Sequence, residues 1–308
     1  MRKIILSLLL SASVFTVFGQ DFLLSEQWFS RLNRNPAATG NSEKIELFYL
    51  NRQQWVGFED APSTNILNAH AFFEGISSGL GFTFFHDKIG ALGTQTLNAK
   101  LAYSYQTLVA NEKLLSFGVS AGILNKSLDQ SKGRLPNGNS PSLENESATN
   151  LDIDLGVEFS MPVFLAGVAV THVLGDRKDA TNIEVPRQFT GYVRGNINLT
   201  DKFSLAPGAV YNNYSSVQPD FFEINATTFY QRAYWLGVGT RFDQEGQFTF
   251  LNAIIGLEWK FLRIGYGYDY SLGKLGNLAK SSHEIMLSGK IGWKQPKQAT
   301  QRFVRFME

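Results

Sequence analysis

Residues 94–106, TQTLNAKLAYSYQ, decide the fold. The odd positions from Leu97 to Tyr105 are apolar, whereas even positions such as Asn98 and Lys100 are polar. A period of two sustained over such a length is typical of a β-strand with one apolar face. The same alternation recurs in 188–199, 262–271 and 284–293. We therefore predict an all-β protein.

The predicted strands are too long for an ordinary soluble sandwich, whose strands average about 5 or 6 residues. Strands of about 9 to 13 residues with one apolar face are what a tilted membrane-crossing strand requires. Closing the sheet pairs every backbone N–H and C=O that lipid would otherwise leave without a partner. Turn signals divide 44–293 into about fourteen strands, so we predict a transmembrane antiparallel β-barrel of the outer-membrane type. The alternative is a secreted soluble protein that packs the same apolar faces into a core.

The ends of the chain do not resemble spanning strands. Residues 1–19 combine Arg2 and Lys3 with an apolar run, which predicts a secretory signal peptide. An even number of strands leaves both ends on one side of the membrane. We therefore predict a periplasmic N-terminal segment at 20–43, the barrel at 44–293 and a periplasmic tail at 294–308.

The connections between the predicted strands alternate between short and long. Outer-membrane barrels have short periplasmic turns and longer extracellular loops. The longest connection, 126–148, is rich in Ser, Asn, Gly and charge, and is either a solvated loop or a partner contact. Aromatic residues near strand ends, among them Trp55, Trp235 and Trp259, are predicted to form the interfacial girdles.

Composition and motifs argue against several other classes of protein. The net charge of +1 gives no electrostatic case for nucleic acid as a partner. The four histidines are scattered and there is no cysteine, so no metal site or cofactor is predicted. There is no Gly-x-Ser-x-Gly elbow, and we predict no catalytic residues and no enzyme. The Gly79-Leu80-Gly81 run lies in a strand pattern, where it favours a curved barrel wall over a phosphate loop.

Several motifs in order along the chain resemble those of the PorP/SprF family. They are 35–40 (NPAATG), 52–58 (RQQWVGF), 61–64 (APST), 79–81 (GLG), 87–90 (DKIG), 268–272 (YDYSL) and 282–285 (SHEI). The resemblance covers essentially the whole chain after the signal segment. Residues 126–150 and 175–185 do not share it.

The resemblance implies an outer-membrane barrel of Bacteroidota that serves the type IX secretion system without being an enzyme. Members of the family are expected to help export or anchor a cognate surface protein, such as a gliding adhesin, by binding its C-terminal sorting domain. The implied partners are outer-membrane lipid, that secreted protein, and other secretion components in the periplasm.

A set of residues in or beside these motifs is predicted to form a structural or docking site at the outer end of the barrel. The set is Arg52, Gln54, Trp55, Gly57, Pro62, Asp87, Lys88, Asp269, Tyr270, His283 and Glu284. Within it, an ion pair from Arg52 to Asp87 or Asp269 would clasp the mouth of the barrel. The alternative is that the motif maintains the mouth and touches no partner.

A transport channel for hydrophobic or small polar solutes is the rival function. Charged residues such as Lys100, Arg194, Arg263 and Glu284 fall on the polar faces of the predicted strands. They would line an aqueous path if the lumen were open. An outer-membrane hydrolase is a third, weaker interpretation.

Overall fold

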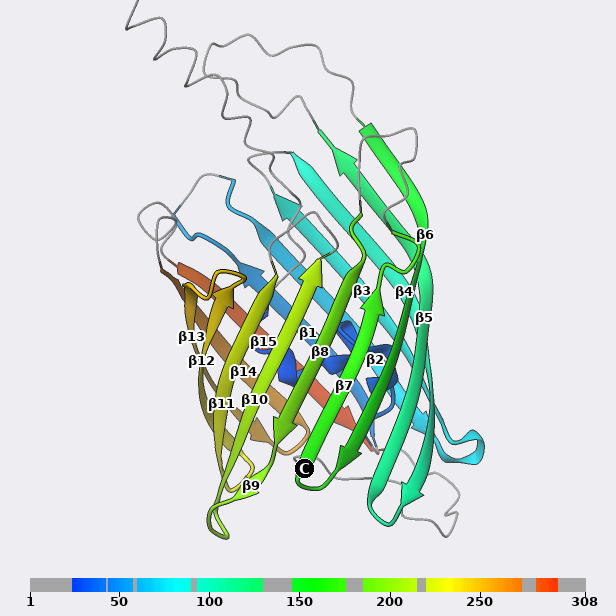
Figure 1. The fold of residues 1–308 in the computed structure, drawn as a ribbon, viewed down its shortest axis with the longest axis vertical. Helices are drawn as coiled ribbons and strands as arrows, with labels where there is room; N and C mark the ends of the chain where they lie inside the picture. Colours follow the sequence, from blue (N-terminus) through cyan, green and yellow to red (C-terminus); the bar gives the residue numbers. More distant parts are fainter. Residues whose placement is uncertain are drawn as a thin grey trace, which may run out of the picture.

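The computed structural model describes residues 24–42, 44–57, 60–89, 93–129, 146–175, 185–214, 220–272 and 281–292. These residues form one antiparallel sheet closed around a lumen (Figure 1). The sheet closes where β1 (Ile45–Gln53) pairs with β15 (Ser281–Ile291), with Ile45 opposite Ile291 and Gln53 opposite His283. Closure leaves no sheet edge facing lipid, which confirms the predicted barrel.

The other strands follow one another around the ring in chain order. They are β2 (Ser63–Phe73), β3 (Ser78–Ile89), β4 (Thr94–Ala110), β5 (Lys113–Leu128), β6 (Glu146–Met161), β7 (Phe164–Thr171), β8 (Gln188–Gly195), β9 (Ile197–Asn198), β10 (Phe203–Tyr214), β11 (Phe221–Tyr230), β12 (Tyr234–Asp243), β13 (Phe248–Trp259) and β14 (Leu262–Ser271).

The elements β8 and β9 are two pieces of one interrupted strand. Both pair with β10, where Arg194 lies opposite Gly208 and Ile197 lies opposite Leu205. Pro207 lies between these pairs and has no N–H to give to a ladder. The Asn196 N–H instead donates to the Val163 carbonyl at 2.9 Å. The fifteen elements therefore make fourteen passes, as the sequence predicted.

The burial pattern is the reverse of that in a soluble protein, because apolar side chains face outward and polar side chains face the lumen. On β4, Leu101 is 71% exposed on the outer surface, whereas its neighbour Lys100 is buried in the lumen. Lipid accepts the outer apolar face, and polar side chains satisfy one another inside. Trp259 is exposed as a girdle residue should be, but Trp235 is 3% exposed and belongs to the interior. The girdle prediction for Trp235 is wrong. Its neighbours Tyr234 and Leu236 are also apolar, so the alternation of apolar and polar residues does not tell which of the three faces the lumen.

The wall is uneven in height. Strands β4, β5 and β6 have 16 or 17 residues, whereas β7 has 8. Figure 1 shows β4 to β6 rising above the other strands at the end that carries the long connections. This is the extracellular end, since the opposite end carries short turns such as 110–113 and 161–164.

Four short 3-10 helices complete the described structure: η1 (Gln27–Phe29), η2 (Arg31–Asn33), η3 (Pro36–Ala38) and η4 (Glu74–Ile76). Among the described residues, none of the helices is long and apolar enough to span a bilayer. The predicted signal peptide at 1–19 and tail at 294–308 lie outside the described residues, as do 130–145 of the longest connection.

Candidate functional site

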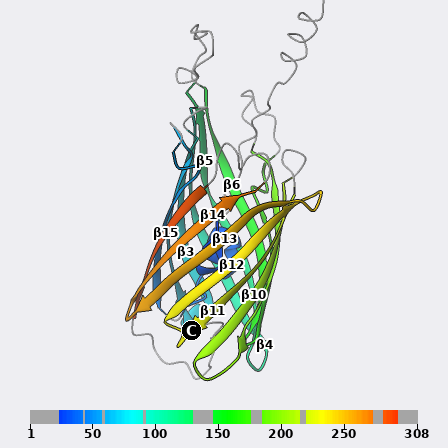
Figure 2. The same cartoon turned by 90° about the vertical axis from the view of Figure 1, so that its left-hand side faces the viewer.

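Residues 24–42 lie inside the barrel. Helices η1, η2 and η3 belong to this segment, and both views show them in blue within the ring of strands (Figures 1 and 2). Most of their side chains are buried, among them Trp28, Leu32 and Asn35. We call residues 24–42 the plug.

The position of the plug differs from the periplasmic segment expected for 20–43. The sequence there has no strand period, which predicts a segment outside the barrel. In the structure, inward-facing side chains of many strands satisfy the polar groups of the plug. An irregular backbone is tolerated at membrane depth where protein surrounds it in this way.

The first attachment of the plug is a cluster of buried charges near the outer end, which we call the clasp. It consists of Ser25, Arg52, Glu223, Arg241, Asp269 and Glu284. The backbone N–H groups of Ser25 and Glu26 donate to the Glu284 carboxylate at 2.9 to 3.0 Å. The Ser25 hydroxyl donates to Asp269.

Two arginines pair with the three carboxylates of the clasp. Arg52 Nη1 lies 2.7 Å from Asp269 Oδ2 and 2.5 Å from Glu284 Oε1. Arg241 spans Asp269, at 3.3 Å, and Glu223, at 2.8 Å. Buried carboxylates are stable only when they are paired and hydrogen-bonded, and these are both. The amide of Gln27 adds a hydrogen bond to Glu223.

The middle of the plug contacts strand β11, which also carries the clasp residue Glu223, and strands β6 and β8. The Trp28 indole N–H donates to Asn225 Oδ1 at 2.8 Å, and the Arg194 guanidinium lies 4.7 Å from the centroid of the Trp28 ring. Arg31 binds Glu158 through two nitrogens, with Nε 3.0 Å from one oxygen and Nη2 3.3 Å from the other. The Tyr192 hydroxyl donates to the same carboxylate at 2.6 Å.

The second attachment, which we call the glycine seat, is the contact of residues 35–40 with Gly79, Gly118 and Gly156. A Cβ added at Gly118 would lie 2.1 Å from the Ala37 nitrogen, and one at Gly156 would lie 1.9 Å from Asn35 Oδ1. A Cβ at Gly79 would lie 2.2 Å from the Thr39 carbonyl oxygen. The plug backbone therefore lies directly against three strands where a side chain is missing.

Asn35 starts the seated turn and fixes it to the wall. Its Oδ1 accepts from the Ala37 N–H at 2.9 Å, which caps η3, and Pro36 occupies the first helical position. Its Nδ2 donates to the Val157 carbonyl and to the Tyr192 hydroxyl at 3.1 and 3.0 Å. The 35–40 motif is therefore a plug anchor, and Gly79 leaves room for its backbone.

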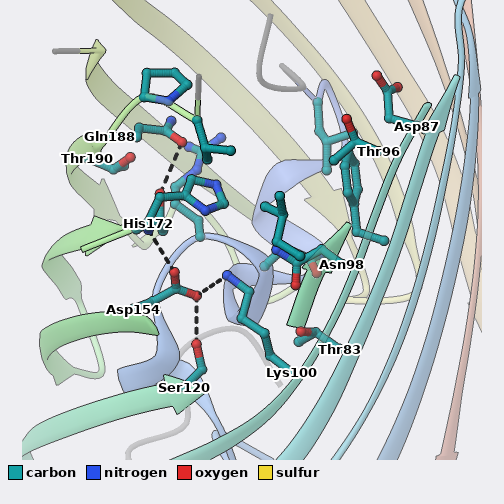
Figure 3. A pocket seen from close by; sticks show the side chains of 18 of the residues that line it. Thr83, Asp87, Thr96, Asn98, Lys100, Ser120, Asp154, His172, Gln188 and Thr190 are labelled. Atoms are coloured by element: carbon teal, nitrogen blue, oxygen red, sulfur yellow. Dashed lines mark hydrogen bonds and ion pairs between the residues drawn. The ribbon is translucent and has the colours of Figure 1, made fainter. Parts of the chain in front are cut away.

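Two cavities lie on either side of the plug. The outer one is lined by wall residues such as Asp87 and Lys100 (Figure 3). Phe85 of the wall and Leu24 and Arg34 of the plug also line it. The inner one faces the short turns and is lined by wall residues of the opposite end. Ser30 and Leu32 of the plug line both, so the plug divides the lumen.

The outer cavity contains a cluster of charges that the sequence did not reveal. Lys100 Nζ lies 2.8 Å from Asp152 and 2.6 Å from Asp154, and His172 Nδ1 lies 3.0 Å from Asp152. The ligand atoms of Asp152, Asp154 and His172 lie within 4.8 Å of one another, a spacing that would suit a metal ion. The Lys100 ammonium contacts both carboxylates and supplies one positive charge against their two.

The structure brings together only part of the predicted site. Arg52, Asp269 and Glu284 meet in the clasp. Of the two partners predicted for Arg52, it pairs with Asp269. Asp87 instead accepts from the Thr64 hydroxyl at 2.6 Å.

The other predicted residues lie at the outer rim or on the outer surface. The Gln54 N–H donates to the Pro62 carbonyl, and Trp55 and Gly57 have left-handed backbones with φ of 50° and 107°. Lys88 and Tyr270 are exposed, and the His283 ring nitrogen lies 2.6 Å from the Tyr266 hydroxyl on the outer face.

The clasp residues Glu223 and Arg241 were missed. Both are charged residues at inward positions of apolar strands, and that could have marked them. Their pairing could not be read from sequence because the partners lie on different strands.

Fold and plug together define an outer-membrane β-barrel whose own N-terminal segment fills its lumen. The family model described as type IX secretion system membrane protein PorP/SprF matches residues 17–288. The chain belongs to this family. Its family and fold are thus those of an outer-membrane barrel of a secretion system, and membership implies contact with other secretion components.

Solved structures similar to the chain are also outer-membrane barrels. The Ralstonia pickettii toluene transporter TbuX is 14% identical with a TM-score of 0.53, over 84% of this chain and 93% of that one. The CymD monoaromatic hydrocarbon channel is 13% identical with a TM-score of 0.55, over 88% and 93%. At these identities the likeness shows the fold alone. No curated protein matches the chain.

Proposed function

We propose that this barrel helps to secrete or anchor a cognate surface protein, of the gliding-adhesin type, by binding its C-terminal sorting domain. Family membership supports a role in type IX secretion. The observation that carries the proposal is the plug, because a lumen occupied by the chain's own residues suits a docking barrel better than an open pore.

The proposed docking surface is the outer rim. The clasp residues Arg52, Asp269 and Glu284 are buried and hold the plug, so they support the surface without contacting the client. Rim residues are available for contact. They are Gln54, Trp55, Gly57, Asp87, Lys88, Tyr270 and His283, whereas Pro62 is buried.

Trp55 is the rim residue best suited to anchor a partner. It is half-buried, its backbone is left-handed, and the next residue, Val56, donates its N–H to the Ser281 carbonyl at 3.1 Å. This bond fixes the rim loop to the start of β15. Indoles held on a rigid backbone are frequent hot spots of protein interfaces.

A pull-down of tagged protein from native outer membranes tests the proposal. We expect a large surface protein with a C-terminal sorting domain to co-purify, and Trp55→Ala to reduce its recovery while the barrel keeps its heat-modifiable mobility. Trp259→Ala is the matched control, since Trp259 is an exposed indole at the periplasmic end. Equal recovery with both variants, or no surface protein at all, would contradict docking at this rim.

A channel for hydrophobic or small polar solutes is the second candidate. The similar solved structures include transporters and channels of aromatic hydrocarbons, and a cavity opens on each side of the plug. Conductance of the purified protein in a planar bilayer separates the two functions. A sustained open current favours the channel, and a silent barrel favours docking.

A further inference from the structure

The inner cavity is richer in positive than in negative side chains. Its described lining includes the basic side chains Arg31, Arg194, Arg232, Arg263 and Lys290, against the carboxylates Glu46, Glu158 and Glu258. Each carboxylate already has a basic neighbour within 4.0 Å. Glu158 pairs with Arg31, Glu258 pairs with Arg263 and Lys290, and Glu46 lies 3.9 Å from Arg263.

Arg194 differs from these paired residues. Its side chain is 3% exposed, and its Nε and Nη2 donate no hydrogen bond to any described residue. No carboxylate of a described residue lies within 4.0 Å of it. Two buried guanidinium nitrogens left without acceptors cost free energy, so such a group in a folded protein calls for an explanation.

The geometry of Arg31 shows what this edge of a guanidinium binds. Arg31 uses its Nε and Nη2 to hold both oxygens of Glu158. The same two nitrogens of Arg194 have no described acceptor, and its guanidinium carbon lies 4.7 Å from the centroid of the Trp28 ring. Arg194 also lines the inner cavity, and a planar oxyanion is the acceptor that suits an Nε and Nη2 edge.

We propose that the inner cavity is an oxyanion-binding site centred on Arg194, which takes a carboxylate or phosphate group arriving from the periplasm. The acceptor would fill the Nε and Nη2 edge, as Glu158 does at Arg31. Because Trp28 belongs to the plug and lies on Arg194, an occupied site would also hold the plug more firmly. This site is separate from the outer rim and does not depend on the proposed docking of a surface protein.

Binding of small anions to the full chain in detergent tests the site. Equilibrium dialysis with inorganic phosphate and with acetate, at constant chloride, compares the two sources of oxyanion, and acetamide serves as the neutral control. We expect saturable binding of at least one anion, close to one per barrel. Binding of phosphate alone would point to a phosphate ligand, and binding of acetate would point to a protein carboxylate.

Variants connect the binding to Arg194. We expect Arg194→Gln to weaken binding at least tenfold, and Arg194→Lys, which keeps the charge but loses the planar edge, to fall between. Lys113→Gln removes an exposed charge at the same end of the barrel and should bind like the wild type. Heat-modifiable mobility checks that each variant is folded, and Arg194→Lys keeps the test decisive if Arg194→Gln does not fold.

Three results would overturn the proposal. One is a wild type that binds neither anion, and another is equal binding by the wild type and Arg194→Lys. The third concerns Glu26, a buried carboxyl close enough to influence Arg194 but outside pairing distance. Binding that appears only in Glu26→Gln would mean that Glu26 already serves as the internal partner of Arg194.

Discussion

The two attachments of the plug hold it in opposite ways. The clasp works through charge, with the Ser25 and Glu26 amides bound to a carboxylate that Arg52 neutralises. The glycine seat works through the absence of side chains, since Gly118 and Gly156 allow the backbone at 35–37 to touch the wall. We therefore expect the clasp to tolerate small shifts but not the loss of a charge, and the seat to tolerate changes of charge but not added volume.

Removal of Arg52 should have the largest effect on this comparison. Arg52→Ala leaves Asp269 and Glu284 buried with less compensation, which costs about 3 to 5 kcal/mol when a buried pair is broken. Denaturant unfolding in lipid vesicles measures the loss of stability. Gln54→Ala at the adjacent rim is the control, and an equal small effect in both would show that the clasp is not a stabilising cluster.

Filling the glycine seat should have the next largest effect. Gly118→Val places a side chain where the Ala37 nitrogen lies, and overpacking of this kind costs about 1 to 3 kcal/mol. We expect the plug to be displaced, so that conductance in a planar bilayer rises above that of the wild type. Gly289→Val is the matched control, because a Cβ at Gly289 meets nothing within 4 Å. A silent Gly118→Val barrel that is folded would contradict the role of the seat.

Asn35 tests the seat through hydrogen bonds instead of volume. Asn35→Ala removes the cap of η3, a change that costs about 0.5 to 2 kcal/mol, and leaves the Tyr192 hydroxyl with one bond fewer. Protease sensitivity of the N-terminal segment, followed by mass spectrometry, should increase while the barrel itself stays resistant. Asn33→Ala, whose amide bonds locally to Ser30, should change the pattern much less.

The smallest expected effect concerns pH and Glu26, next to the clasp. Burial, and then the nearby Glu284, raise the pKa of Glu26 well above its usual value, although Arg263 and Arg194 oppose the shift. A carboxyl whose pKa is raised by folding stabilises the folded state at low pH, and this contribution is lost as pH rises through the folded pKa. Glu26→Gln should therefore match the wild type near pH 4 and be the more stable of the two at neutral pH. Unfolding midpoints across that range measure this, and a variant that is less stable at neutral pH would reverse the assignment.

The strands of the barrel could be predicted from sequence because their signal is local. In 94–106 the alternation of apolar and polar residues predicts which side chains face outward and which face the lumen. Leu101 and Lys100 lie on the predicted faces. The Arg52–Asp269 pair could be named as one of two options because motif residues at both ends of the barrel sequence suggested it. The alternation does not assign Trp235 to one face of its strand, because Trp235 is one of three successive apolar residues.

The plug could not be predicted because its contacts are remote. Ser25 meets Glu284 across 259 positions of sequence, and Asn35 meets Tyr192 across 157. No periodicity records such pairs. The sequence does not tell whether a glycine such as Gly118 allows a bend, faces open space or makes room for another segment of backbone.

The sequence by itself determined that the chain would form long two-faced strands and close them into a lipid-facing ring, because the period of two and the need to pair every backbone group act locally. Only the tertiary structure decided what fills that ring. Closure brings inward charges and glycines from distant strands around one lumen, and their combined charge and shape select the N-terminal segment as its occupant.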